Sequence, residues 1–95
     1  MVKIKFYTKK GCIACNIMRD ILVEIMRNYE DELTFENIPC NQYDEVIEKD
    51  YIIDKFPSIV IMDNANTENY VIIEGTNTKK NVEAIINKFR DYDGT

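Results

Sequence analysis

The sequence predicts an α/β fold in which a four-stranded mixed sheet is flanked by three helices, in the order β-α-β-α-β-β-α. Apolar residues alternate over residues 1–7 and then recur at helical spacing over 12–29. A continuous apolar run at 58–62 is followed by turn residues and a second strand-like stretch at 70–73, which is typical of a β-hairpin. A chain of 95 residues has room for one hydrophobic core. We therefore expect a single domain over residues 1–95.

The composition excludes several classes of protein. Hydrophobic residues make up 45% of the chain and charged residues 31%, which is ordinary for a globular protein. The net charge of −5 argues against a general nucleic-acid binder, which would carry a basic face. No apolar run approaches the roughly 20 residues of a membrane span, and no basic start followed by an apolar run indicates a secretory signal. We expect a cytoplasmic monomer that binds neither nucleic acid nor membranes.

The first strand and the first helix are joined by a short polar loop at 8–11 that ends in glycine. On the strand, Val2, Ile4 and Phe6 face one side, which predicts one well-buried face. The helix over 12–29 carries an apolar stripe, as a helix packed on a sheet does. Its members are Ala14, Met18, Ile21, Leu22, Ile25 and Tyr29. Ile13, Ile17 and Met26 widen this stripe, which indicates a well-packed helix.

The rest of the chain supplies the other elements. Residues 33–38 are expected to form a strand that ends at Pro39, and the apolar spacing from Asn41 or Gln42 to about Asp50 predicts a short helix. After the hairpin, Asn77 or Thr78 can cap a last helix. The right-handed crossover rule makes the first two strands parallel, and the economical packing places helices on both faces of the sheet.

Two cysteines, Cys12 and Cys15, stand three positions apart where the strand pattern changes to a helical one. In a reducing compartment, such a pair is more often catalytic or metal-binding than structural. Disulfide exchange needs a thiolate, and a helix N-terminus with Lys9 and Lys10 nearby favours the thiolate form of Cys12. A closed metal site needs about four ligands and the chain has no histidine, so we expect no metal. Cys40 together with a dimer would leave a metal site open as an alternative.

This order of elements, with CxxC opening the first helix, resembles the thioredoxin-like superfamily over essentially the whole chain. Residues 7–15 look like the active-site entry of glutaredoxins, whereas residues 51–58 look like the thioredoxin segment that leads to a cis-proline. Gly75 falls where these families place a glycine near the substrate groove. The sequence also departs from both families. Gly11 replaces the thioredoxin tryptophan, Ile13-Ala14 replaces Gly-Pro or Pro-Tyr, and Phe6 occupies the position of the thioredoxin buried aspartate.

The resemblance implies a thioredoxin-like fold and a thiol–disulfide oxidoreductase of the electron-carrier type that reduces protein disulfides. Cys12 would be the exposed nucleophile and Cys15 the resolving thiol, with no cofactor beyond their disulfide and with a reductase or glutathione as electron donor. The Phe56–Pro57 bond is expected to be cis. The substrate-binding residues would be Lys9, Gly11, Ile13, Ala14, Phe56, Pro57 and Gly75.

Three alternatives remain at this point. One is a redox-sensing binding module with little turnover, another is a glutathione-dependent glutaredoxin, and the third is a carrier of a metal or cluster. Cys40, at the end of the second strand, is a candidate auxiliary thiol.

Overall fold

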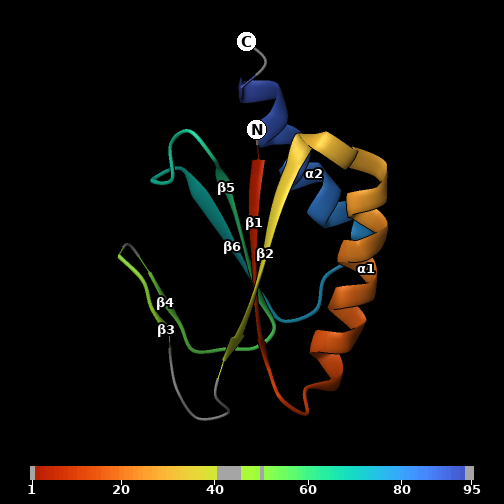
Figure 1. Ribbon diagram of the computed structural model, residues 1–95, viewed down its shortest axis with the longest axis vertical. Helices are drawn as coiled ribbons and strands as arrows, with labels where there is room; N and C mark the ends of the chain where they lie inside the picture. Colours follow the sequence, from red (N-terminus) through yellow and green to blue (C-terminus); the bar gives the residue numbers. More distant parts are fainter. Residues whose placement is uncertain (1, 41–45, 50, 94–95) are drawn as a thin grey trace.

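The computed structural model describes residues 2–40, 46–49 and 51–93. Its central sheet contains β1 (Val2–Lys9), β2 (Leu33–Cys40), β5 (Ser58–Asp63) and β6 (Tyr70–Glu74). The strand order is β2-β1-β5-β6, with β1 parallel to β2 and antiparallel to β5. β5 and β6 form the expected antiparallel hairpin (Figure 1). The predicted mixed sheet of four strands and the parallel first pair are confirmed.

Two helices, α1 (Ile13–Tyr29) and α2 (Lys79–Asp93), cover one face of this sheet (Figure 1). A 3₁₀ turn, η1 (Glu30–Glu32), connects α1 to β2. Side chains of both helices and of the facing strands form the larger core cluster, which includes Ile4, Phe6, Met18, Leu22, Ile59, Ile61, Val82 and Ile86. The expectation that helices lie on both faces was wrong for the described residues, because both described helices bury their apolar stripes in this same cluster.

A small β-ribbon, β3 (Val46–Ile47) and β4 (Ile52–Ile53), stands where the second of three helices was expected. The predicted helix was therefore wrong at Val46 and Ile47, and its positions 41–45 and 50 lie outside the described residues. The four residues of the ribbon are all β-branched, and such side chains fit extended backbone better than helix. The described part of the chain thus contains two α-helices instead of three.

The ribbon covers the second face of the sheet around Tyr7, whose side chain is completely buried. The Tyr7 hydroxyl donates a hydrogen bond to Oε1 of Glu48 at 3.1 Å and lies 3.2 Å from the hydroxyl of Tyr51. Burial, with the Tyr51 hydrogen bond second, raises the pKa of Tyr7 well above its ordinary value. The sequence pattern indicated one buried face for the first strand, but at Tyr7 both faces are buried.

The strand β2 continues through Pro39 and Cys40, two residues beyond its expected end. Proline cannot donate a hydrogen bond to a neighbouring strand, so it is tolerated only where one side of the strand is unpaired or a ladder begins. β2 is an edge strand whose neighbour is β1, and Pro39 lies opposite Thr8 in that pairing. The edge position explains why Pro39 does not end the strand.

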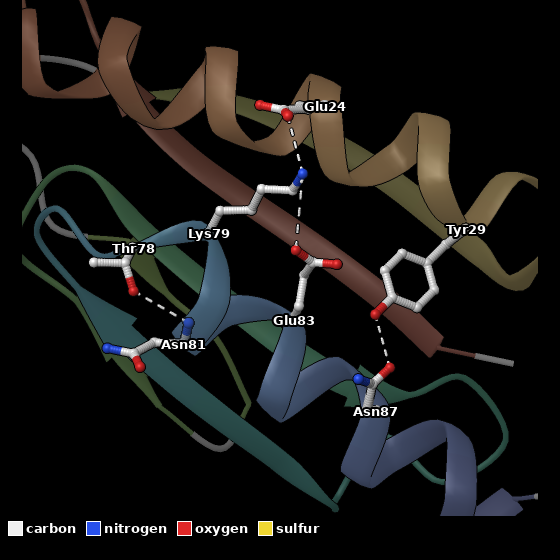
Figure 2. Close-up of polar contacts among 7 residues, drawn as sticks. All are labelled: Glu24, Tyr29, Thr78, Lys79, Asn81, Glu83 and Asn87. Carbon is white, nitrogen blue, oxygen red and sulfur yellow. Dashed lines mark hydrogen bonds and ion pairs between the residues drawn. The ribbon is translucent and has the colours of Figure 1, made fainter.

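The last helix begins at one of the two predicted caps. The Thr78 hydroxyl accepts a hydrogen bond from the backbone N–H of Asn81 at 3.1 Å, which is the N-cap arrangement (Figure 2). Asn77 precedes this cap and accepts a hydrogen bond from the backbone N–H of Thr78 at 2.8 Å. Thr78 is therefore the cap, and Asn77 supports the turn that leads to it.

Polar contacts tie α2 to α1 (Figure 2). The Lys79 ammonium lies 2.9 Å from Oε1 of Glu24 on α1 and 4.0 Å from Oε1 of Glu83, one turn further along α2. Further along the same interface, the Tyr29 hydroxyl donates a hydrogen bond to Oδ1 of Asn87 at 2.7 Å. The two contacts, one near the start of α2 and one in its middle, link α2 to α1 along their interface.

We expect Ile4→Ala to destabilise the protein by about 2–5 kcal/mol, because Ile4 is fully buried on the central strand and its removal leaves a cavity. Val23→Ala is the matched control, since Val23 is 46% exposed on α1, and it should change stability by about 0.5 kcal/mol or less. Urea unfolding of both variants in the same oxidation state measures the difference. Equal effects of the two substitutions would contradict this packing.

Candidate active site

Cys12 and Cys15 lie at the junction between β1 and α1 and are joined by a disulfide, with their Cα atoms 5.2 Å apart. Cys12 has extended backbone and is the N-cap of α1. The backbone N–H of Cys15 donates a hydrogen bond to Sγ of Cys12 at 3.0 Å. The sulfur thus accepts from one of the unpaired N–H groups at the helix start, as a serine or aspartate oxygen does in other helices.

The two sulfur-bearing residues differ in exposure. Cys12 is half-buried, whereas Cys15 is only 1% exposed and belongs to the buried side of α1. A macromolecule that approaches this end of the helix therefore meets Cys12 first. The difference arises from helical geometry, because Cys15 lies in the first turn on the face that packs against the sheet.

The loop before Cys12 contains Lys9, Lys10 and Gly11. Gly11 has φ of +77°, and a Cβ placed on it would meet nothing within 4 Å, so the backbone conformation and not a lack of space favours glycine. The Lys9 ammonium lies 5.8 Å from the centre of the Phe56 ring, a cation–π distance. Lys10 is exposed. Two positively charged residues therefore precede Cys12 in the loop.

The Phe56–Pro57 peptide bond is cis, as predicted. The register of β5 against β1 pairs Ser58 with Tyr7, so Pro57 lies beside the strand end that leads into the cysteine loop. The backbone N–H of Gly75 donates a hydrogen bond to the Pro57 carbonyl at 2.7 Å. Gly75 has φ of +78°, a conformation that other residues rarely adopt. The sheet thus brings Pro57 and Gly75 to the edge where β1 ends.

Two isoleucines on α1 are exposed beside the disulfide. Ile13 is 77% exposed and Ile17, one turn further along the same side of the helix, is 50% exposed. Ala14, between the cysteines, is half-buried. The sequence pattern assigned Ile13 and Ile17 to a packed stripe, which was wrong, and it did not indicate that Ile17 is exposed beside the cysteines. The available signal was their position at the cysteine end of the helix.

Cys40 ends β2 directly opposite Lys9 of β1, so it lies at the same edge of the sheet. Its Sγ donates a hydrogen bond to the Ile38 carbonyl at 3.4 Å. Burial raises the pKa of the Cys40 thiol above its ordinary value, a hydrogen bond with the Thr8 backbone opposes this shift, and the charge of Glu48 adds to it. Cys40 is therefore held as a protonated thiol at neutral pH.

Within residues 2–40, 46–49 and 51–93, no three histidine, cysteine, aspartate or glutamate side chains gather as ligands for a metal ion. In the same ranges, no helix is long and apolar enough to cross a membrane.

A family model described as thioredoxin matches residues 1–88 of this chain. The chain belongs to the thioredoxin family. Among solved structures, chloroplastic thioredoxin z is similar with a TM-score of 0.77 at 14% identity, over 96% of this chain and 80% of that one. A thioredoxin-like protein from Bacillus cereus has a TM-score of 0.64 at 14% identity, over 93% and 87% of the two chains.

Oxidised mitochondrial thioredoxin 3 from Saccharomyces cerevisiae is also similar, with a TM-score of 0.59 at 14% identity over 92% of this chain and 77% of that one. No curated protein matches the chain in sequence. At this identity the solved structures establish the fold alone. The family and the Cys12–Cys15 disulfide together are consistent with a thiol–disulfide oxidoreductase, and the family generally acts on protein disulfides.

We expect Cys40 of the folded protein to be alkylated with a pH midpoint above that of the same residue in the unfolded chain, because burial disfavours its thiolate. With a folded pKa raised above the unfolded one, this thiol stabilises the fold below the unfolded pKa. That stabilisation is lost as the pH rises through the folded pKa. Iodoacetamide labelling of the oxidised protein with and without urea, followed by mass spectrometry, measures both midpoints. Coincident midpoints would exclude the burial effect.

Proposed function

We propose that this protein is a dithiol–disulfide oxidoreductase that reduces disulfides in other proteins, with Cys12 as nucleophile and Cys15 as resolving thiol. The observation that carries the proposal is the disulfide at the start of α1, which joins an accessible cysteine to a buried one. A structural disulfide has no need of this asymmetry. A catalytic pair does need it, because one sulfur must be accessible to the substrate and the other must react only after the mixed disulfide has formed.

The first step starts from the reduced pair. The Cys12 thiolate attacks one sulfur of the substrate disulfide, a Cys12–substrate bond forms, and the other substrate sulfur leaves as a thiolate and takes up a proton. The hydrogen bond from the Cys15 N–H, the positive end of the α1 dipole and the nearby lysines all favour the thiolate form of Cys12.

The second step releases the product. Cys15 loses its proton and attacks Sγ of Cys12, the Cys12–Cys15 bond forms, and the second substrate sulfur leaves as a thiolate. Two electrons have then passed from the protein to the substrate. A reductase or glutathione, in a reducing compartment such as the cytoplasm, returns two electrons to the Cys12–Cys15 disulfide.

The substrate would dock on the surface around Cys12. Ile13 and Ile17 supply exposed apolar area, and the side chain of Lys9 lies against the ring of Phe56 on the other side of the loop. Pro57 and Gly75, joined by a backbone hydrogen bond, complete the edge of the sheet. In the proposed complex, Gly11 and Ala14 border the attacking sulfur of Cys12, because Gly11 precedes Cys12 in the loop and Ala14 follows it in the first helical turn.

Cysteine variants test the division of roles. Cys12→Ser should reduce disulfide reductase activity to background, because it removes the attacking sulfur. Cys15→Ser should leave a stable Cys12–substrate mixed disulfide, because nothing resolves it. Cys40→Ser is the matched control and should retain activity. Insulin reduction and non-reducing gels measure these outcomes. Accumulation of a mixed disulfide on Cys15 instead of Cys12 would reverse the assignment, and an inactive wild-type protein would refute the oxidoreductase.

Ile13→Ser combined with Ile17→Ser should raise the KM for a protein disulfide with little change in kcat. Complete burial of one such side chain by a partner contributes about 1.5–3 kcal/mol, which corresponds to roughly a 10- to 150-fold change, so loss of both should lower kcat/KM roughly tenfold or more. Val23→Ser changes a similarly exposed residue further along α1 and should have no effect. A small aromatic disulfide, which needs no docking surface, should be reduced equally by all three proteins. An equal loss with the small disulfide would contradict a docking role.

A further inference from the structure

A hollow of about 150 Å³ lies on the sheet face that carries the β3–β4 ribbon, on the opposite side from the two helices. Lys3 and Lys5 of β1 border it, because alternate residues of a strand point to the same side. Met62 of β5, the partner of Lys3 across the sheet, also lines it. One ordered water needs only about 10–15 Å³ of such space, so the hollow can hold a small molecule.

Lysine side chains line this hollow, although the protein as a whole is acidic. Of the residues that the structure describes, Lys3, Lys5 and Lys49 line it together with the carboxylate of Glu48, although the chain as a whole has a net charge of −5. Like charges held close together raise the free energy of the folded state unless a counter-charge lies between them. A negatively charged ligand in the hollow would therefore lower this free energy.

The carboxylate of Glu48 is already engaged. Oε1 of Glu48 accepts the hydrogen bond from the Tyr7 hydroxyl at 3.1 Å, and Oε2 lies 4.0 Å from the Lys5 ammonium. Among residues 2–40, 46–49 and 51–93, neither Lys3 nor Lys49 forms an ion pair. The ammonium groups of Lys3 and Lys49 thus lie at the hollow without an ion-pair partner among the described residues.

The rest of the wall suits a ligand that has a small apolar part and a polar group that accepts a hydrogen bond from a hydroxyl. Tyr51 lines the hollow, and its position is fixed by ring contact with Tyr70 at 5.0 Å and by the 3.2 Å approach of its hydroxyl to that of Tyr7. Thr67, in the turn between β5 and β6, supplies a hydroxyl. Met62 is buried and adds an apolar patch.

We propose that this hollow is a binding site for a phosphate group, either free or carried by a small molecule, held by Lys3, Lys5 and Lys49. Lysine ammonium groups bind phosphate oxygens through strong charge-assisted hydrogen bonds, and the Thr67 hydroxyl adds a neutral one. The site is separate from the Cys12–Cys15 disulfide and does not depend on the proposed oxidoreductase activity. It gives the face opposite the helices a function of its own.

Titration of the full chain with inorganic phosphate and with phenyl phosphate, at constant ionic strength made up with chloride, tests the site. Amide NMR signals of residues 3–5 and 48–51 should shift saturably. Lys3→Gln combined with Lys49→Gln should weaken binding roughly tenfold or more, because both uncompensated charges are lost. Lys80→Gln, which changes an exposed lysine on α2, should leave the affinity unchanged.

Glu48→Gln should have the opposite effect on phosphate affinity. It keeps the shape of the side chain and an acceptor for the Tyr7 hydroxyl but removes the negative charge, so phosphate should bind more tightly. Tighter binding of phenyl phosphate than of inorganic phosphate assigns the site to a phosphate ester, and equal binding assigns it to the free ion. Absence of saturable shifts, or equal weakening by Lys80→Gln, would overturn the proposal.

Discussion

The pairing of β1 on both of its sides is the constraint on which the rest of the structure depends. On one side Lys9 lies opposite Cys40 of β2, and on the other Tyr7 lies opposite Ser58 of β5. These two registers bring the cysteine loop, the free thiol and the cis-proline to one edge of the sheet. A slip of one residue would turn every side chain of β1 to the opposite face and would separate these groups. The position of the site therefore depends more on the strand register than on any single residue.

Much of the fold could be predicted because its signals are local. The change from alternating to helical spacing places the start of α1 at the cysteines, and the helix observed begins one residue later, with Cys12 as its cap. The apolar run of β5 followed by turn residues predicted the hairpin, and Thr78 is one of the two caps expected for α2. In each case a few neighbouring residues determine the structure, so distant contacts need not be known.

The parts that could not be predicted depend on distant contacts. Val46 and Ile47 fit the apolar spacing of a helix as well as that of a strand, and only the pairing with Ile52 and Ile53 and the packing around Tyr7 decides between them. Ile17 is apolar at helical spacing in the same way as buried Met18. Its exposure shows that no described element covers that side chain on α1, and apolar spacing by itself does not reveal this.

The two cysteines are close in sequence, which limits how far the structure changes between the oxidised and the reduced state. The disulfide closes a ring within one turn of α1, with the Cα atoms 5.2 Å apart, so it links residues that the helix already holds as neighbours. A short ring restricts the unfolded chain much less than a long one does. Oxidation and reduction therefore remain local events, and the sheet and the core can stay the same in both states. In the proposed reaction, the protein would take up and release two electrons at the start of α1 without rebuilding its interior.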